Sequence, residues 1–172
     1  MPRKRKVFDT EGHAHFITFS CYKRRRLLDT DQAKRIVIGE MAAQLRNLDG
    51  RCIGFVVMPN HVHTLVWFTQ PLQSSHFIQL WKQNSSRSLS DFLRTSLKSY
   101  AKTFTDGDPI WQTRYYDFNV GSEQKCAKKL EYMHQNPVKA GFVTDPCEWQ
   151  FSSARFYVLG KSVGVLVGMD LS

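Results

Sequence analysis

The segment "VVMPNHVHTLVW" (56–67) predicts a β-hairpin with two histidines at the start of its second strand. The runs "RCIGFVVM" (51–58) and "HVHTLVWF" (61–68) are rich in β-branched and aromatic residues, and "PN" between them suits a tight turn. Residues i and i+2 of a strand share a face, so His61 and His63 project together. They form a candidate metal-binding pair; the alternative is two strand histidines satisfied by water or neighbours.

The segments around this hairpin predict an α+β fold. Alternating strand and helix patterns give the order strand, helix, strand, strand, helix, strand, helix, which is typical of a ferredoxin-like (RRM-like) antiparallel sheet with helices on one face. The expected elements are a strand at 15–23, a helix at 29–50 with an Asp cap, a helical stretch at 74–103 broken near 84–88, a strand at 115–120, and a helix at 121–136 capped by Ser122 and ended by Pro137.

Length and composition favour one domain and a polyanionic partner. The 172 residues, 42% hydrophobic, are expected to form a single domain with a basic N-terminal arm (1–13) and a C-terminal tail (157–172). A formal net charge of +9 favours a nucleic acid or another polyanion. The four cysteines form no C-x-x-C pair, which argues against a zinc module or a disulfide framework. Without a signal-like or membrane-length apolar run, we expect a cytoplasmic protein with no membrane partner.

A further candidate group lies on the helix predicted at 121–136. Tyr132 and Asn136 are four residues apart and therefore share a helical face, and the Asn136 side-chain oxygen suits Mg²⁺ or Mn²⁺. The residue before a proline is disfavoured in helical geometry, so Asn136 is expected at or just past the helix end. Gln135 is the alternative ligand, and a packing tyrosine is the alternative role for Tyr132.

Three separated motifs together resemble a known family. They are "VVMPNHVHTLVW", "WQTRYYDF" and "EYMHQNPVKAGFV", and in this order and spacing they resemble the single-tyrosine HUH transposases, especially the REP-associated tyrosine transposases. The similarity runs from about residue 14 to about residue 156. The letters HUH stand for two histidines separated by a hydrophobic residue, U, and here His61, Val62 and His63 occupy these positions.

The resemblance implies a chemistry for the candidate residues. It makes His61, His63 and Asn136 the ligands of a divalent metal, Mg²⁺ or Mn²⁺, and Tyr132 the nucleophile. Single-stranded DNA at REP-like palindromic hairpins would be nicked and joined through a covalent 5′-phosphotyrosine, by a monomer or a homodimer. Tyr115 and Tyr116 are the other tyrosines to weigh as nucleophile, and the resemblance makes their segment a structural or DNA-contacting element.

Basic residues supply candidate contacts to the DNA backbone. Such contacts position a nucleic acid without reading its sequence. A non-catalytic protein that binds single-stranded DNA or RNA hairpins on the same fold remains the alternative function. The candidate DNA-binding residues are Arg3, Lys4, Arg5, Lys6, Lys23, Arg24, Arg25, Arg26, Arg114, Lys128, Lys129 and Lys139.

Overall fold

A four-stranded antiparallel sheet organises the protein. The computed structural model describes residues 14–70, 72–96 and 107–168. Within them the strands β1 (Ala14–Ser20), β2 (Arg51–Val57), β3 (His61–Trp67) and β4 (Tyr116–Val120) pair in the order β2-β3-β1-β4. The predicted fold class is confirmed. The N-terminal arm (1–13), with Arg3, Lys4, Arg5 and Lys6, lies outside the described residues.

The predicted hairpin of β2 and β3 is present and sets the register of the sheet. The Met58 N–H donates to the His61 carbonyl at 2.9 Å and closes the turn. On its other side β3 pairs with β1, which places His61 opposite Ser20 and His63 opposite Thr18. The two histidines therefore lie at the end of the two central strands.

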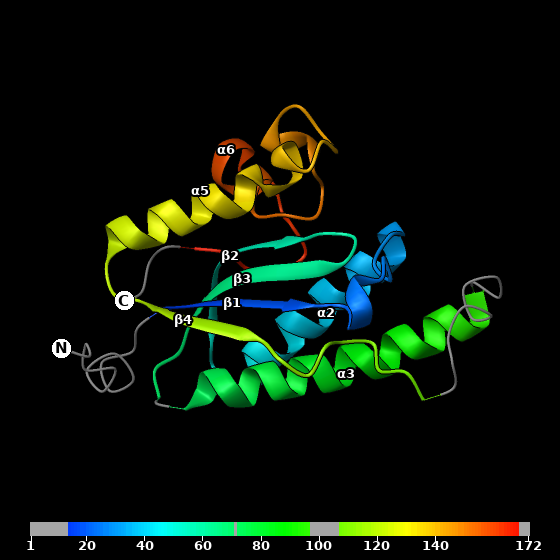
Figure 1. The fold of residues 1–172 in the computed structure, drawn as a ribbon. Helices are drawn as coiled ribbons and strands as arrows, with labels where there is room; N and C mark the ends of the chain where they lie inside the picture. The colour runs from blue at the N-terminus through cyan, green and yellow to red at the C-terminus, as the bar shows by residue number, and fades with distance from the viewer. Residues whose placement is uncertain (1–13, 71, 97–106, 169–172) are drawn as a thin grey trace.

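Helices α2 (Asp31–Asn47) and α3 (Gln73–Ser96) pack on one face of the sheet, as expected (Figure 1). The main core lies between them and the strands, and the buried Trp81 indole donates to the Val37 carbonyl at 2.9 Å. Thr30, not an Asp, caps α2, because its hydroxyl accepts from the Ala33 N–H at 3.2 Å.

The predicted break near 84–88 is wrong, because α3 is continuous across these residues. Ser85 is fully buried, and its hydroxyl donates within the helix to the Trp81 carbonyl at 2.6 Å. The same hydroxyl accepts from the Trp111 indole at 3.0 Å. Packing thus keeps the serine-rich stretch helical against its weak intrinsic preference. The end of the predicted stretch, 97–103, lies outside the described residues.

Helix α5 (Glu123–Lys139) lies against the opposite face of the sheet, above β2 and β3 in Figure 1. Ser122 caps it as predicted, with its hydroxyl accepting from the Lys125 N–H at 3.2 Å. The prediction that Pro137 ends the helix is wrong. A proline inside a helix removes one N–H donor and crowds the carbonyl four residues before it, but α5 continues to Lys139 and the Ala140 N–H donates to the Asn136 carbonyl at 3.0 Å. Asn136 is therefore inside the helix.

The segment after α5 runs along the edge of β2. It contains two short helices, η2 (Pro146–Glu148) and α6 (Ala154–Leu159), and a short helix η1 (Tyr22–Arg24) follows β1. The tail reaches β2 at Cys52, where it forms a parallel bridge through Val167. Among the described helices, none combines the length and the apolar character that a membrane span needs.

Candidate active site between β3 and α5

Strand β3 presents His61 and His63 on the face that α5 covers. Their ring centroids are 4.9 Å apart. The Nδ1 of His63 is hydrogen-bonded to the Thr18 hydroxyl at 2.6 Å, and the Nδ1 of His61 donates to the Asn60 side-chain oxygen at 2.6 Å. A polar partner on one ring nitrogen orients an imidazole and leaves its other nitrogen for a ligand. Both histidines have such a partner here.

Helix α5 places Tyr132 and Asn136 against these histidines. The Tyr132 ring is 5.5 Å from the His63 ring, centroid to centroid, in an edge-to-face arrangement, and its side chain is 45% exposed. The Asn136 side chain lies close enough to the His61 imidazole to act on the pKa of His61. The structure thus brings together the four residues that the sequence singles out, from β3 and from one face of α5.

Burial sets the protonation of the two histidines. It lowers the pKa of His63 to about 3, helped by the nearby charges of His61, Lys129 and Arg24. Burial also lowers the pKa of His61 to about 4; the charge of Arg24 acts in the same direction, and the Asn136 side chain opposes it. Both imidazoles are therefore neutral at pH 7, which is the form that binds a metal.

The donor set at this site fits a divalent cation. Across the described ranges, no three His, Cys, Asp or Glu side chains gather as a metal site. The candidate set instead consists of two neutral imidazoles and the amide of Asn136, which is a hard oxygen donor of the kind that Mg²⁺ and Mn²⁺ accept. These cations prefer six ligands, so three protein donors leave room for oxygens of a substrate or water.

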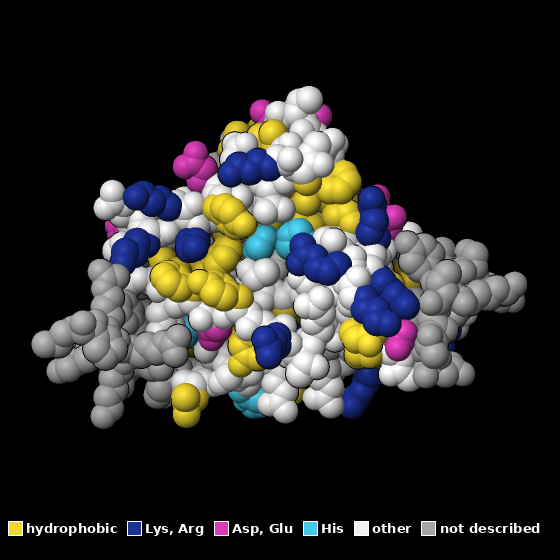
Figure 2. All heavy atoms as spheres, viewed as in Figure 1, with side chains coloured by type: hydrophobic (Ala, Val, Ile, Leu, Met, Phe, Trp, Pro, Cys, Tyr) yellow, Lys and Arg dark blue, Asp and Glu magenta, His cyan; other side chains and the backbone are white. Residues whose placement is uncertain are grey.

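Three cationic side chains lie around the candidate site. The Lys139 ammonium is 5.8 Å from the centroid of the Tyr132 ring, and the Lys129 ammonium is 4.6 Å from that of Phe16. Arg24 donates to the Ser20 hydroxyl at 3.2 Å. Figure 2 shows dark-blue cationic side chains on either side of the cyan histidines. The histidines therefore lie in a surface region of positive potential, which suits a phosphate substrate.

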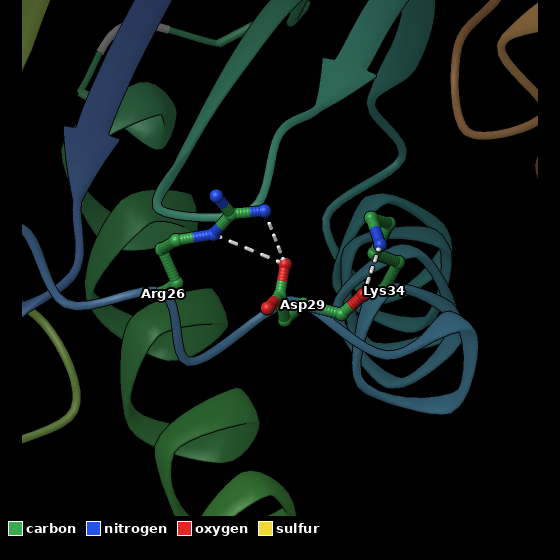
Figure 3. A network of polar contacts seen from close by, with 3 residues as sticks. All are labelled: Arg26, Asp29 and Lys34. Carbon is green, nitrogen blue, oxygen red and sulfur yellow. Dashed lines mark hydrogen bonds and ion pairs between the residues drawn. The ribbon is translucent and has the colours of Figure 1, made fainter. Parts of the chain in front are cut away.

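The other basic residues named from the sequence are arranged differently. Arg26 donates to the Asp29 carboxylate at 2.7 Å, and the buried Lys34 donates to the Asp29 carbonyl at 2.9 Å (Figure 3). Arg25 pairs with Asp108 at 3.5 Å. In the cluster 23–26, Arg24 thus faces the histidines while Arg25 and Arg26 contact carboxylates. Of the remaining candidates, Lys23 lies over the Tyr22 ring, and Arg114 and Lys128 are exposed.

Three residues of the site were not found from the sequence. Thr18 and Phe16 belong to β1 and reach His63 only because β1 pairs with β3; the Phe16 ring stacks on His63 with centroids 5.5 Å apart. The sequence predicts Asn60 only as a turn residue. Its position directly before His61 was the available signal, since a side-chain oxygen at that position can reach the neighbouring imidazole.

The family resemblance is confirmed by comparison with known proteins. Residues 9–136 match the family described as Transposase IS200 like. A REP-associated tyrosine transposase of Escherichia coli K12 is 25% identical over 146 residues, which cover 83% of this chain and 77% of that protein. A Haemophilus influenzae relative of the REP-associated type is 28% identical over 104 residues, and this chain spans only 57% of its length.

A solved structure shares the fold. It is a REP-associated tyrosine transposase bound to a REP hairpin, with a TM-score of 0.70 at 18% identity, over 99% of this chain and 94% of that one. This likeness shows that the two proteins share a fold. Because the family match extends over most of the chain, this protein belongs to the family of IS200-like transposases.

Proposed function

We propose that this protein nicks and joins single-stranded DNA at REP-type palindromic hairpins in a metal-dependent reaction, as one transposase domain over residues 1–172. The observation that carries the proposal is the placement of Tyr132 and Asn136 of α5 against His61 and His63 of β3. A phenol beside a metal-type donor set, in a positively charged surface region, suits attack on a phosphodiester.

The proposed metal ligands are His61, His63 and Asn136. A bound Mg²⁺ or Mn²⁺ ion would polarise the scissile phosphate and neutralise the charge that develops in the transition state. Thr18 and Asn60 hold the two imidazoles in orientation through their Nδ1 atoms. These contacts place both rings before DNA binds, so less ordering is needed during the reaction.

Tyr132 is the proposed nucleophile. Its phenol oxygen attacks the phosphorus and forms a 5′-phosphotyrosine, the bond from phosphorus to the 3′ oxygen breaks, and that fragment leaves with a 3′-hydroxyl after taking up a proton. The phenol proton passes to solvent or a base. Lys139, 5.8 Å from the Tyr132 ring, stabilises the negative charge around the attacked phosphate. A 3′-hydroxyl that later attacks the phosphotyrosine restores a phosphodiester, because the energy of the bond is retained.

The proposed partner is a DNA hairpin with a single-stranded flank. Support comes from the formal net charge of +9 and from the positions of Arg24, Lys129 and Lys139 around the site. The nucleophile and the metal-type donors also come from one chain, and we therefore propose that a monomer carries a complete site. A homodimer that exchanges α5 is the alternative arrangement.

The competing function is hairpin binding without catalysis. RRM-type proteins stack bases on the central strands of an open sheet. Here α5 packs on β2 and β3 through Leu130 and Met133 and occupies much of that surface. The sheet is therefore less suited to an RRM-type platform than to a site built between β3 and α5.

A labelled hairpin with a single-stranded flank tests the proposal. Wild type, Tyr132→Phe and the control Tyr115→Phe would be incubated with Mg²⁺, Mn²⁺ or EDTA and resolved on denaturing gels for cut DNA and a covalent adduct. We expect metal-dependent cutting and adduct in wild type and Tyr115→Phe, and neither in Tyr132→Phe. An adduct that persists in Tyr132→Phe would overturn the assignment. Binding without cutting by wild type under every metal would favour the binding protein.

A further inference from the structure

Strand β4 carries two exposed aromatic side chains on the face of the sheet where Tyr132 lies. Tyr116 is 54% and Phe118 is 42% exposed. They are two residues apart and so point to the same side, and their rings are nearly parallel, at 3° with centroids 6.2 Å apart. Exposing two adjacent large rings to water is unfavourable, and such patches commonly mark binding sites.

These two aromatic residues adjoin the candidate active site. Phe118 lies opposite Phe16 on β1, and the Phe16 ring contacts the rings of both His63 and Tyr132, with centroids 5.5 Å and 6.1 Å apart. Tyr116 lies opposite Thr18, which is hydrogen-bonded to His63. The exposed rings of Tyr132, Phe118 and Tyr116 therefore lie on one face of the sheet, with the buried Phe16 between Tyr132 and the edge strand β4. Figure 2 shows this yellow patch beside the cyan histidines.

The charges on this surface suit a nucleic acid. The Lys129 ammonium is 5.1 Å from the Phe118 ring centroid and 4.6 Å from that of Phe16. Asp117, between the two exposed aromatic residues, points to the other face and contacts the His15 imidazole at 2.9 Å. The exposed rings thus have a cation beside them, and the carboxylate of their own strand is turned away.

We propose that Tyr116 and Phe118 form a stacking platform for unpaired DNA bases next to the scissile phosphate, with Lys129 contacting the adjoining backbone. This inference rests on the function proposed above and extends it to the flank of the hairpin. Aromatic side chains bind single strands by stacking on base faces, and a neighbouring cation binds the phosphates. Bases inside a duplex have no free face, so the platform selects unpaired nucleotides. It tolerates different sequences, because every base has a π-face.

Tyr115, which precedes Tyr116 in the sequence, supplies a matched control. Tyr115 is 44% exposed, but it lies directly before β4, and the Lys82 ammonium is 5.7 Å from the centroid of its ring. Replacing Tyr115 removes a comparable exposed aromatic residue and leaves the platform intact. Phe118→Trp retains a stacking ring, whereas Phe118→Leu retains apolar volume without one. Phe118→Leu is used in place of Phe118→Ala because it removes the ring with less risk to folding.

The test is equilibrium binding of a fluorescent hairpin in EDTA, which prevents cutting. A series of oligonucleotides carries one abasic site at successive positions of the single-stranded flank. For Tyr116→Ala and Phe118→Leu we expect affinity losses on the order of tenfold per stacked base, with Phe118→Trp and Tyr115→Ala near wild type. The losses should disappear when the abasic site falls at the stacked position. The substitutions of Tyr116 and Phe118 should leave the dependence of the affinity on salt concentration unchanged. Lys129→Gln should lower the slope of log affinity against log salt concentration by about 1.

The outcomes separate this inference from the proposed function. If wild type forms its covalent adduct and the platform variants bind every oligonucleotide as wild type does, the platform is overturned and the catalytic proposal stands. Losses that persist with every abasic oligonucleotide also overturn it, because they would not depend on a base. If wild type forms no adduct but one abasic position abolishes the losses, the platform stands on a binding protein.

Discussion

Substituting Gly54 by alanine should disturb α5 and, through it, the nucleophile. Gly54 lies in β2 under α5, beside a register shift between Cys52 and Gly54. A Cβ built at this position would overlap Leu130 Cδ2 and lie 3.0 Å from Ser153 Oγ and 3.2 Å from Met133 Cε. Adding one methyl group to such a packed contact typically costs about 1–3 kcal/mol.

The overlapped side chain has little freedom to move away. Leu130 is 6% exposed and packs in the cluster between the sheet and α5. Part of the overlap should therefore be relieved by a shift of α5. Tyr132 and Asn136 lie on that helix, and a displacement of about 1 Å is enough to lower a rate by on the order of a hundredfold. We expect Gly54→Ala to lower the rate of adduct formation by much more than the loss of folded protein alone would explain.

Denaturant unfolding and single-turnover adduct formation, measured on the same preparations, test this reasoning. Gly39→Ala is the control, because Gly39 lies on α2 with open space around its Cβ position. It should raise the free energy of unfolding by roughly 0.5–1 kcal/mol and leave adduct formation unchanged. Adding Leu130→Val to Gly54→Ala should cost less than the sum of the two single changes. Wild-type stability and activity in Gly54→Ala would refute the proposed close contact.

Three further changes probe the site and the core. Thr18→Val should weaken Mn²⁺ binding, measured by calorimetry, by about 10- to 100-fold, because it releases the His63 ring. Thr18→Ser keeps a hydroxyl and should preserve the affinity for Mn²⁺. Equal affinities of the two variants would contradict the role of Thr18 in orienting His63. Burial lowers the pKa of His134 from 6.5 to about 4, so the unfolded chain binds a proton more readily than the folded protein, and the free energy of unfolding falls as the pH drops from about 6.5 towards 4. Measured in EDTA, the change of the free energy of unfolding with pH should be smaller in His134→Gln. An unchanged pH dependence in this variant would count against the burial effect. Ser85→Ala removes the acceptor of the Trp111 indole and should lower the free energy of unfolding, measured with denaturant, by about 1–3 kcal/mol. Adduct formation by the folded fraction should not change. An unchanged free energy of unfolding would mean that the indole finds another partner.

The local patterns of the sequence determined much of this protein. Alternation and turn residues were enough for the β2–β3 hairpin and for the common face of His61 and His63, because strand periodicity is a backbone property. Helical spacing was enough to place Tyr132 and Asn136 on one face of α5, and Ser122 as its cap was visible in the same way. These features depend on neighbours in sequence, so they could be predicted from one chain.

Tertiary packing decided the rest. The pairing of β1 with β3 brings Thr18 and Phe16 to His63, and nothing local to residues 14–20 indicates that partner. Burial holds the serine-rich part of α3 and the last turn of α5 around Pro137 in helical form, against local preferences that predicted a break and an end. The site itself exists because α5 crosses β2 closely at Gly54, and such a close approach depends on residues far apart in sequence, whose contact energies appear only in the folded chain.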